Sequence, residues 1–261
     1  METIILVLTG LFTGFLAGLF GIGGGLIIVP IITFVLFHFH DIAPNISICF
    51  GIGSALISVI LTGSLATFSH IKNRNFDFSI IRPLIIPTTF GSFFGSMLTV
   101  YIDFLFLKYF FIIYCFFTAL KLKKLIKLDN FYRKLSNQSA AVIFSTISVL
   151  VGIGGGTLFA PFLISKKIST YKSISSSSFL GVIIGVIASI SFFIRQPFQS
   201  LGFNIDYFGL LYLPAFFYLT IPSLLAVYIS TKILLAIPEK KIKDMFSMLL
   251  ICIGMILIFK L

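Results

Sequence analysis

Gly21-Ile22-Gly23-Gly24-Gly25, with Pro30 five residues on, decides the fold of this 261-residue chain, because the pattern returns as Gly152-Ile153-Gly154-Gly155-Gly156 with Pro161. Both copies lie in stretches apolar enough to be buried in a membrane. Backbone groups that leave a helix inside a bilayer are costly unless protein, water or a ligand satisfies them. Two such breaks predict a duplicated transporter built around a central site.

Composition assigns the chain to the polytopic membrane proteins. Hydrophobic residues make up 58% of the sequence and charged residues 10%, and the mean hydropathy is +1.14. A net charge of +11 would suggest nucleic acid in a soluble protein, but here the Lys and Arg residues lie between apolar runs and are typical of topology signals. We therefore expect the lipid bilayer as a partner and no nucleic acid.

Ten apolar segments in two sets of five predict an all-α fold. They cover residues 4–20, 26–39, 45–69, 80–101, 104–120, 138–151, 157–165, 173–194, 207–231 and 242–259. The basic stretch between the sets predicts three parts: a first membrane repeat at 1–120, a basic cytoplasmic linker at 121–137 and a second membrane repeat at 138–261. Asp77 and Asp206 occupy matching turns in the two halves, where we expect each to cap the following helix.

Positive charge predicts that each glycine segment folds as a hairpin. A straight helix over residues 4–37 would be about 51 Å long, against a hydrocarbon core of about 30 Å. If both segments turn back, loops 70–82, 121–138, 166–172 and 232–243 share one side and hold sixteen of the 19 Lys and Arg residues, which is the bias of cytoplasmic loops. The charges fit hairpins of half or full membrane depth equally.

This topology predicts two inverted repeats, each a Gly-broken helical hairpin plus three transmembrane helices. The first hairpin has no Lys or Arg at either end and the second is flanked by them, so the two enter from opposite faces. We expect a multi-pass protein of the bacterial inner (cell) membrane with both termini outside the cytoplasm.

The helix that begins after each glycine run predicts an anion site. Its first N–H groups lack partners and carry roughly half a positive charge, and glycine lets the backbone approach a ligand. No Lys, Arg, Asp or Glu lies well inside a segment, so hydroxyls would supply the remaining contacts. Close helix packing is the alternative explanation for these small residues. The predicted substrate-binding residues are Gly21, Gly23, Gly24, Gly25, Ser54, Gly152, Gly154, Gly155, Gly156, Ser177 and Ser178.

Catalytic and metal sites find little support in the sequence. The three cysteines stand singly without a metal-ligand spacing, so we predict no metal and no cofactor. An intramembrane enzyme would need a nucleophile with a base, paired carboxylates or a metal, and the segments offer serines alone. We therefore predict no enzyme. His38, His40 and His70 lie near segment ends, where we expect them to be solvated.

Several motifs together resemble the sulfite exporter TauE/SafE family of membrane permeases over nearly the whole chain. They are the two GIGGG-x4-P runs, Gly51-Ile52-Gly53-Ser54, Ser176-Ser177-Ser178, Arg74-Asn75-Phe76-Asp77 and the pair Gly91 and Gly95. The family commonly has a Thr-Ser pair early in the helix after each hairpin, and here Gly53-Ser54 and Ser177-Ser178 take those places. The resemblance implies transport of small sulfur-containing anions such as sulfite or sulfonates.

These observations predict a secondary transporter, a permease that moves a small anionic substrate by alternating access around a midplane site. An inside-negative membrane potential would drive an anion outward without ATP. A non-catalytic membrane assembly or scaffold protein, or a transporter of a different small solute, is the alternative. The coupling ion and the oligomeric state are not fixed by these residues.

Overall fold

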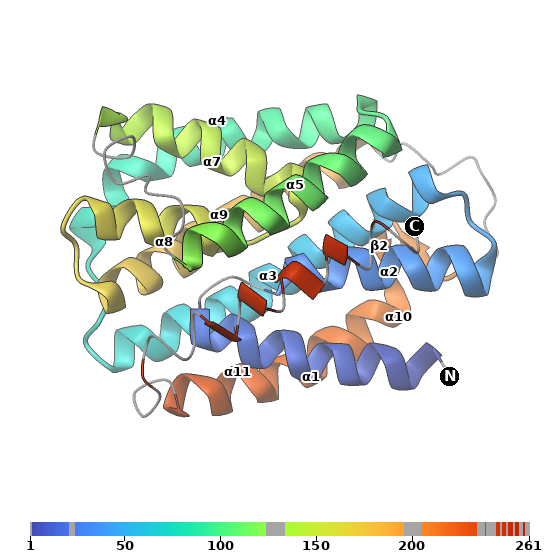
Figure 1. Ribbon diagram of the computed structural model, residues 1–261, viewed down its shortest axis with the longest axis horizontal. Helices are drawn as coiled ribbons and strands as arrows, with labels where there is room; N and C mark the ends of the chain where they lie inside the picture. Colours follow the sequence, from blue (N-terminus) through green and yellow to red (C-terminus); the bar gives the residue numbers. More distant parts are fainter. Residues whose placement is uncertain are drawn as a thin grey trace.

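The chain is seen in a computed structural model that describes residues 2–20, 24–123, 134–195 and 205–233, with 238, 244–245, 247–248, 250–252, 254–255 and 258. Helices lie side by side along the long axis (Figure 1), which confirms the predicted all-α membrane fold. The helices of the first half are α1 (Glu2–Phe20), α2 (Gly25–His40), α3 (Pro44–Lys72), α4 (Phe78–Tyr101) and α5 (Phe104–Leu122). Those of the second half are α7 (Asn137–Val151), α8 (Gly156–Ser165), α9 (Thr170–Arg195), α10 (Leu213–Ala215) and α11 (Ile221–Ile233).

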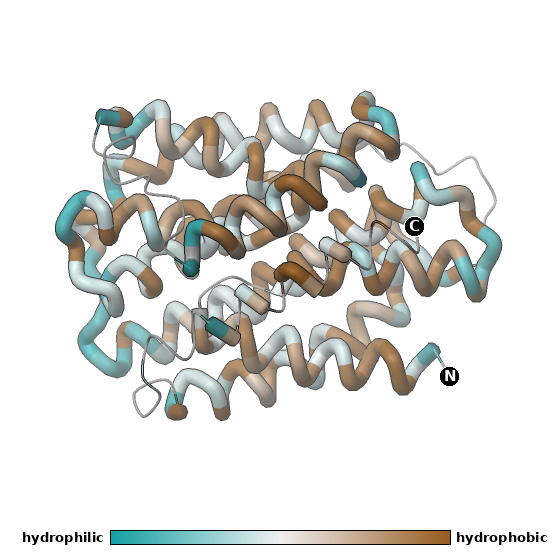
Figure 2. Tube along the Cα trace, viewed as in Figure 1, coloured by the Kyte–Doolittle hydropathy of each residue, from teal (hydrophilic) through white to brown (hydrophobic). Residues whose placement is uncertain are grey.

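The helices of the second hairpin are too short to span a membrane, unlike α1 of the first hairpin. In the described parts of the chain, four stretches are long and apolar enough to cross a membrane: Glu2–Leu19, Pro44–Lys72, Thr170–Ile194 and Leu213–Ile233. Helix α7 has 15 residues and α8 has 10. At about 1.5 Å per residue, each falls short of a hydrocarbon core of about 30 Å. Apolar residues occupy the middle of the bundle and hydrophilic residues its two ends (Figure 2).

Among the predicted segments whose first residues are described, the one at 207–231 does not start as a helix. It begins with an antiparallel hairpin of β1 (Tyr207–Phe208) and β2 (Leu211–Tyr212), followed by α10, one π-helical stretch η1 (Phe216–Thr220) and α11. Gly209 has a φ of 60°, which lets the chain reverse between the strands. Aromatic residues favour strands, so this apolar run accommodates a hairpin as readily as a helix.

Asp77 and Asp206 differ although their turns match in sequence. Asp77 caps α4 as predicted, since its carboxylate accepts from the Ser79 N–H at 3.2 Å, and it also pairs with Lys172 Nζ of α9 at 2.9 Å. The Ser79 hydroxyl, followed by Lys172, lowers the pKa of Asp77 to about 2. Asp206 instead precedes the β-hairpin, and its backbone carbonyl accepts from the Leu213 N–H at 3.0 Å. The cap predicted there is wrong.

Glycines set the closest helix contacts, which join the two halves. Helix α1 packs on η1 and α11. A β carbon on Gly10 would overlap the Leu219 backbone of η1, and one on Gly14 would overlap the Ser223 backbone of α11. Helix α4 packs on α7, and a β carbon on Gly91 would overlap the α7 backbone in the same way. The long helices α3 and α9 pack against each other between these pairs. Small residues permit this approach, as is usual for helices in lipid.

Charge divides the bundle into two ends. Most of the described basic residues gather where α3, α5, α8 and α11 end and α7 and α9 begin, on the left of Figure 1, whereas Lys108 near the start of α5 and Arg195 at the end of α9 lie toward the opposite end. The residues gathered on the left are Lys72, Arg74, Lys121, Lys123, Lys134, Lys166, Lys167, Lys172 and Lys232. We call this the basic end, and the end with the start of α1 the outer end. Among described residues, none of the buried ones is Lys, Arg, Asp or Glu. His70 is only 3% exposed because α3 continues past it, so its predicted solvation is wrong.

Candidate functional site

Both predicted helix breaks are present. Helix α1 ends at Phe20 and α2 begins at Gly25, while α7 ends at Val151 and α8 begins at Gly156. Gly24 and Gly155 directly precede α2 and α8, and each has a φ of 73°. Glycine adopts this left-handed conformation without strain, which explains why glycine occupies both positions. The predicted binding residues Gly21 and Gly23 lie outside the described residues.

Gly152 ends α7 in a Schellman cap. Its φ is 68°, its N–H donates to the Val149 carbonyl at 3.0 Å, and the Ile153 N–H donates to the Ser148 carbonyl at 2.8 Å. The Gly152 amide is therefore used by the helix that it terminates. The amides that follow the cap begin at Gly154.

The two helices after the breaks start with the same backbone geometry. In α8, the N–H groups of Leu158 and Phe159 donate to the Gly155 carbonyl at 3.1 and 2.8 Å. In α2, the corresponding bonds run from Ile27 and Ile28 to the Gly24 carbonyl at 3.0 and 3.3 Å. The amides before these first helical bonds have no acceptor within their own helix. Each break therefore presents the partial positive charge of a helix N-terminus.

The two breaks lie against each other inside the bundle. A β carbon on Gly25 would overlap the carbonyl oxygen of Gly152 and lie 3.0 Å from the α carbon of Ile153. In return, a β carbon on Gly152 would lie 2.6 Å from a Val29 methyl group. Only glycine fits where two backbones approach this closely. The two glycine runs therefore meet at Gly25 and Gly152.

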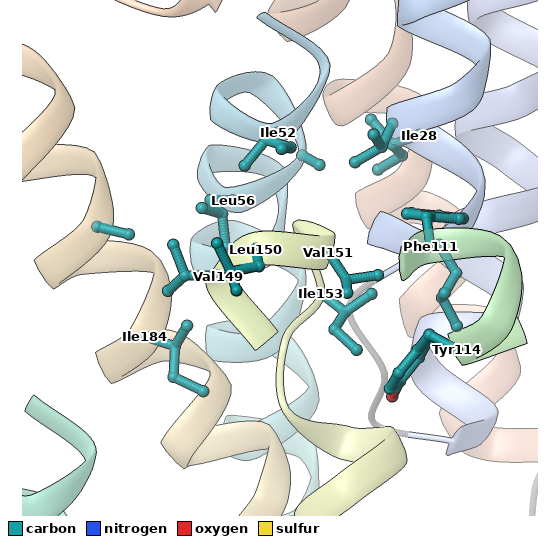
Figure 3. Close-up of a cluster of buried hydrophobic side chains, with 14 of the residues drawn as sticks. Ile28, Ile52, Leu56, Phe111, Tyr114, Val149, Leu150, Val151, Ile153 and Ile184 are labelled. Atoms are coloured by element: carbon teal, nitrogen blue, oxygen red, sulfur yellow. The ribbon is translucent and has the colours of Figure 1, made fainter. Parts of the chain in front are cut away.

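Helices α3 and α9 enclose the second break. The Ile52 α carbon and the Ala55 β carbon of α3 lie 3.3 and 3.6 Å from the β-carbon position of Gly152. The Gly154 carbonyl oxygen fills the place of a β carbon on Gly181 of α9. Figure 3 shows Val149, Leu150 and Val151 of α7 between these helices, with Tyr114 of α5 on the opposite side.

The three predicted serines are buried near the breaks, and each hydroxyl has a protein partner. Ser54 Oγ accepts from the Tyr212 N–H at 2.9 Å, so this side chain faces strand β2. Ser177 and Ser178 donate to the Ile174 carbonyl at 2.8 and 3.0 Å. Ser177 lies one turn before Gly181 on the same face of α9.

Sequence reasoning missed a polar pair beside the second break. Thr157, in the first turn of α8, shares a hydrogen bond with the Tyr114 hydroxyl of α5, and both side chains are buried. Thr157 is the first polar residue after the GIGGG run and could have been selected for that reason. Tyr114 lies in a run of aromatic residues, and no feature of the sequence distinguishes it from its neighbours.

Several buried hydroxyls have no partner within the described parts of the chain. Ser148 lies in the last turn of α7 before the break, Ser58 lies on α3, and Ser175 and Ser176 lie on α9. An unpaired hydroxyl in apolar surroundings is costly, so such groups mark places where water or a polar ligand binds.

A second polar cluster lies at the outer end. The Tyr212 hydroxyl donates to Glu2, and His40 Nε2 lies 3.2 Å from Glu2 Oε2 and 3.0 Å from the Tyr212 oxygen. His40 is therefore engaged by protein rather than solvated. Across the described residues, no three His, Cys, Asp or Glu side chains gather as metal ligands. A cavity of about 440 Å³ opens here, lined by Glu2, Thr3, His40, Ile205, Asp206, Tyr212, Pro214 and Tyr218.

Comparison with known proteins identifies the family. Residues 6–257 match the sequence profile described as Sulfite exporter TauE/SafE. The chain belongs to this family. A "Probable membrane transporter protein" of Haemophilus influenzae is 30% identical over 271 residues, covering 97% of this chain and 98% of the relative. One of Methanocaldococcus jannaschii, also named a probable membrane transporter protein, is 27% identical over 264 residues, covering 97% and 94%. No solved structure matches the chain.

Membership in the TauE/SafE family, together with the apolar helices, makes this protein a multi-pass membrane transporter. A member of this family handles a small substrate within the bilayer, and membership implies a transporter rather than an enzyme.

Proposed function

We propose that this protein is a secondary transporter for small anions, with sulfite, sulfonates or related sulfur-containing anions as its substrate class. The anion binds where the two glycine breaks meet. One observation carries the proposal: Gly25 at the start of α2 touches the backbone of Gly152, the glycine that ends α7 just before α8, inside the bundle. The description of the family as sulfite exporters supports a sulfur-containing anion as the substrate.

Electrostatics favours an anion at this place. Two helix N-termini together supply roughly one compensating positive charge. Within the described residues no buried Lys or Arg adds a fixed charge, which keeps binding reversible. The amides of Gly154, Gly155 and Gly156 follow the Schellman cap and start α8, and we assign them the main contacts. Those of Gly24 and Gly25 contribute from the first break.

Hydroxyl groups complete the proposed site. Thr157 stands in the first turn of α8, and the unpaired Ser148 hydroxyl lies one turn before the break. A hydroxyl can donate to an oxyanion. Ser177 lines the site from α9, with Ser178 beside it, and Ser54 links it to the β-hairpin.

We further propose that residues 1–120 and 138–261 act as inverted repeats. The packing of α1 on α11 corresponds to that of α7 on α4, and the packing of α2 on α3 corresponds to that of α8 on α9. The contact between Gly25 and Gly152 closes the site, so an anion enters when the hairpins separate, as alternating access requires. The basic end faces the cytoplasm of a bacterial cell in this scheme.

Sulfite flux tests the proposal. Purified protein in liposomes is expected to take up radiolabelled sulfite in a saturable manner, with inhibition by excess unlabelled sulfite and with protein-free liposomes as the control. Parallel assays with a sulfonate and with chloride define the substrate class. Protein that neither moves nor binds any oxyanion or sulfonate contradicts the proposal and favours an assembly role.

A further inference from the structure

The β1–β2 hairpin covers α3 between the outer cavity and the glycine breaks. The Tyr212 N–H donates to Ser54 Oγ at 2.9 Å, and the Leu210 carbonyl oxygen fills the place of a β carbon on Gly53. Leu210 and Tyr212 are each 1% exposed. The same stretch of α3 touches Gly152 through Ala55. One helix thickness therefore separates the hairpin from the breaks.

Tyr212 is the most buried of the residues that line the outer cavity. The other lining side chains come from α1, α2, the residues before β1, α10 and η1. The Tyr207 ring packs edge-on against Phe50 of α3 at 5.5 Å, and the Phe208 ring lies 5.2 Å from Phe193 of α9. These contacts hold the hairpin against α3 and α9.

Side chains from α1 and α2 fix Tyr212 in this position. Its hydroxyl proton goes to Glu2, so its oxygen accepts from His40 Nε2–H, which also faces the second Glu2 oxygen. Hydrogen bonds to a carboxylate are stronger than those between neutral groups. The Glu2 and His40 side chains are each 25% exposed. The hydrogen-bonded group of Glu2, His40 and Tyr212, which we call the lock, therefore forms part of the cavity wall.

We infer that the Tyr207–Tyr212 hairpin is the outer gate of the anion route and that Tyr212 is the residue that locks it. The inference rests on the proposed transport function and adds the segment that closes the outer side. Release of the Tyr212 hydroxyl frees the ring from Glu2 and His40 and lets the hairpin leave Ser54. The cavity then reaches the stretch of α3 beside the breaks.

The hairpin suits this role because its own strand pairing is weak, so that its position depends on these side-chain contacts. Each strand has two residues, and a two-stranded hairpin is at best marginally stable alone. The chain continues into the π-helical stretch Phe216–Thr220, and such irregular turns are frequent at functional sites.

Cys49 allows a direct test. It is 5% exposed and lies one helical turn before Gly53, against which the Leu210 carbonyl of the hairpin packs. With Cys115→Ala and Cys252→Ser in place, Cys49 is the single thiol. Its labelling by a membrane-impermeant maleimide is followed in reconstituted protein. We expect Tyr212→Phe, which keeps the ring, to raise the labelling rate about tenfold, which corresponds to about 1.4 kcal/mol.

Tyr218→Phe is the matched control, because Tyr218 lines the same cavity without belonging to the lock; its labelling rate stays at the parental value. Glu2→Gln removes the charge of the carboxylate but keeps an acceptor for the Tyr212 hydroxyl, so we expect it to raise the Cys49 labelling rate less than Tyr212→Phe does. This variant tests the gate independently if Tyr212→Phe does not fold. Unchanged labelling in both lock variants, or an equal rise in Tyr218→Phe, overturns the gate. Labelling needs no substrate, so this result is independent of whether sulfite flux is found.

Discussion

The two glycine breaks share a sequence pattern and a backbone, but their side chains differ. Gly24 and Gly155 have the same φ of 73° and precede helices that start alike. Two residues after these glycines, the second break has Thr157, whose hydroxyl is hydrogen-bonded to Tyr114. The first break has Leu26 at this position, an apolar residue that is 1% exposed. The comparison teaches that the duplicated feature is the set of backbone amides, and that only the second break has a hydroxyl at this position.

The largest expected effect comes from breaking the contact between the two halves. In Gly25→Ala the new β carbon would overlap the Gly152 carbonyl, and since both are backbone positions the hairpins must move apart. We expect sulfite flux to be lost and the free energy of unfolding to fall by about 1 to 3 kcal/mol. Flux in liposomes and thermal unfolding in detergent measure the two effects.

Gly63→Ala is the control for that variant, because its β carbon would lie 3.1 Å from a Val182 methyl group and 3.2 Å from the Ser178 carbonyl oxygen of α9, without overlap. It is expected to keep most of the parental flux. Parental flux in Gly25→Ala would show that the contact between the breaks has no role in transport.

A second pair of variants tests whether the backbones are equivalent. Gly24→Ala and Gly155→Ala each place a side chain in the left-handed region, at a cost of about 1 to 2 kcal/mol. Their nearest contacts are also similar, at 2.9 Å to Thr13 and 3.0 Å to Ile184. We expect equal falls in unfolding temperature. Adding Ile184→Val to Gly155→Ala should recover part of the loss, and a clear difference between the single variants would argue against equivalence.

The side-chain difference is tested at Thr157. Thr157→Val keeps the shape and removes the bond to Tyr114, at an expected cost of about 0.5 to 1.5 kcal/mol in stability. We also expect a raised KM for sulfite. Tyr114→Phe should behave alike, and the double variant should lose less than the sum of the two. Leu26→Met, a swap of similar volume at the first break, should leave KM unchanged; an equal rise there would contradict the asymmetry.

The smallest expected effect is on the pH dependence of the unfolding temperature, and it distinguishes the two matching turns at Asp77 and Asp206. The pKa of Asp77 is lowered from 3.8 to about 2, so its stabilising contribution is present above about pH 4 and is lost as the pH falls through about 2. The bond to Lys172 lies at the surface, where such pairs contribute little. Unfolding temperatures from pH 7 to pH 2 should fall more steeply for the parent than for Asp77→Asn. Asp206→Asn, which removes no cap, should follow the parent.

Local patterns predicted much of this structure because the responsible forces act locally. The glycine runs marked both helix breaks, and Asp77 capped α4 through the N–H of Ser79, two residues further on. The prediction was wrong at 207–231, where aromatic residues fit a strand as well as a helix. Asp206 failed as a cap for the same reason, since no helix follows it directly.

Residues that meet through the tertiary fold could not be predicted in this way. Glu2, His40 and Tyr212 are joined by hydrogen bonds although they lie far apart in the sequence. Tyr114 reaches Thr157 from a helix of the other half. His70 looked solvated because it lies near the end of an apolar run, but α3 carries it into the bundle.

Locating a bound anion tests the central claim most directly. Selenite is the selenium analogue of sulfite, and its position in crystals of the protein is visible from anomalous scattering at the selenium edge. We predict one selenium peak within about 4 Å of the amide nitrogens of Gly154–Thr157, on the side that faces Gly24 and Gly25, because the selenite oxygens accept the N–H bonds at about 2.9 Å and selenium lies one bond further away. A selenite peak in the outer cavity, or elsewhere away from both glycine breaks, would contradict the account.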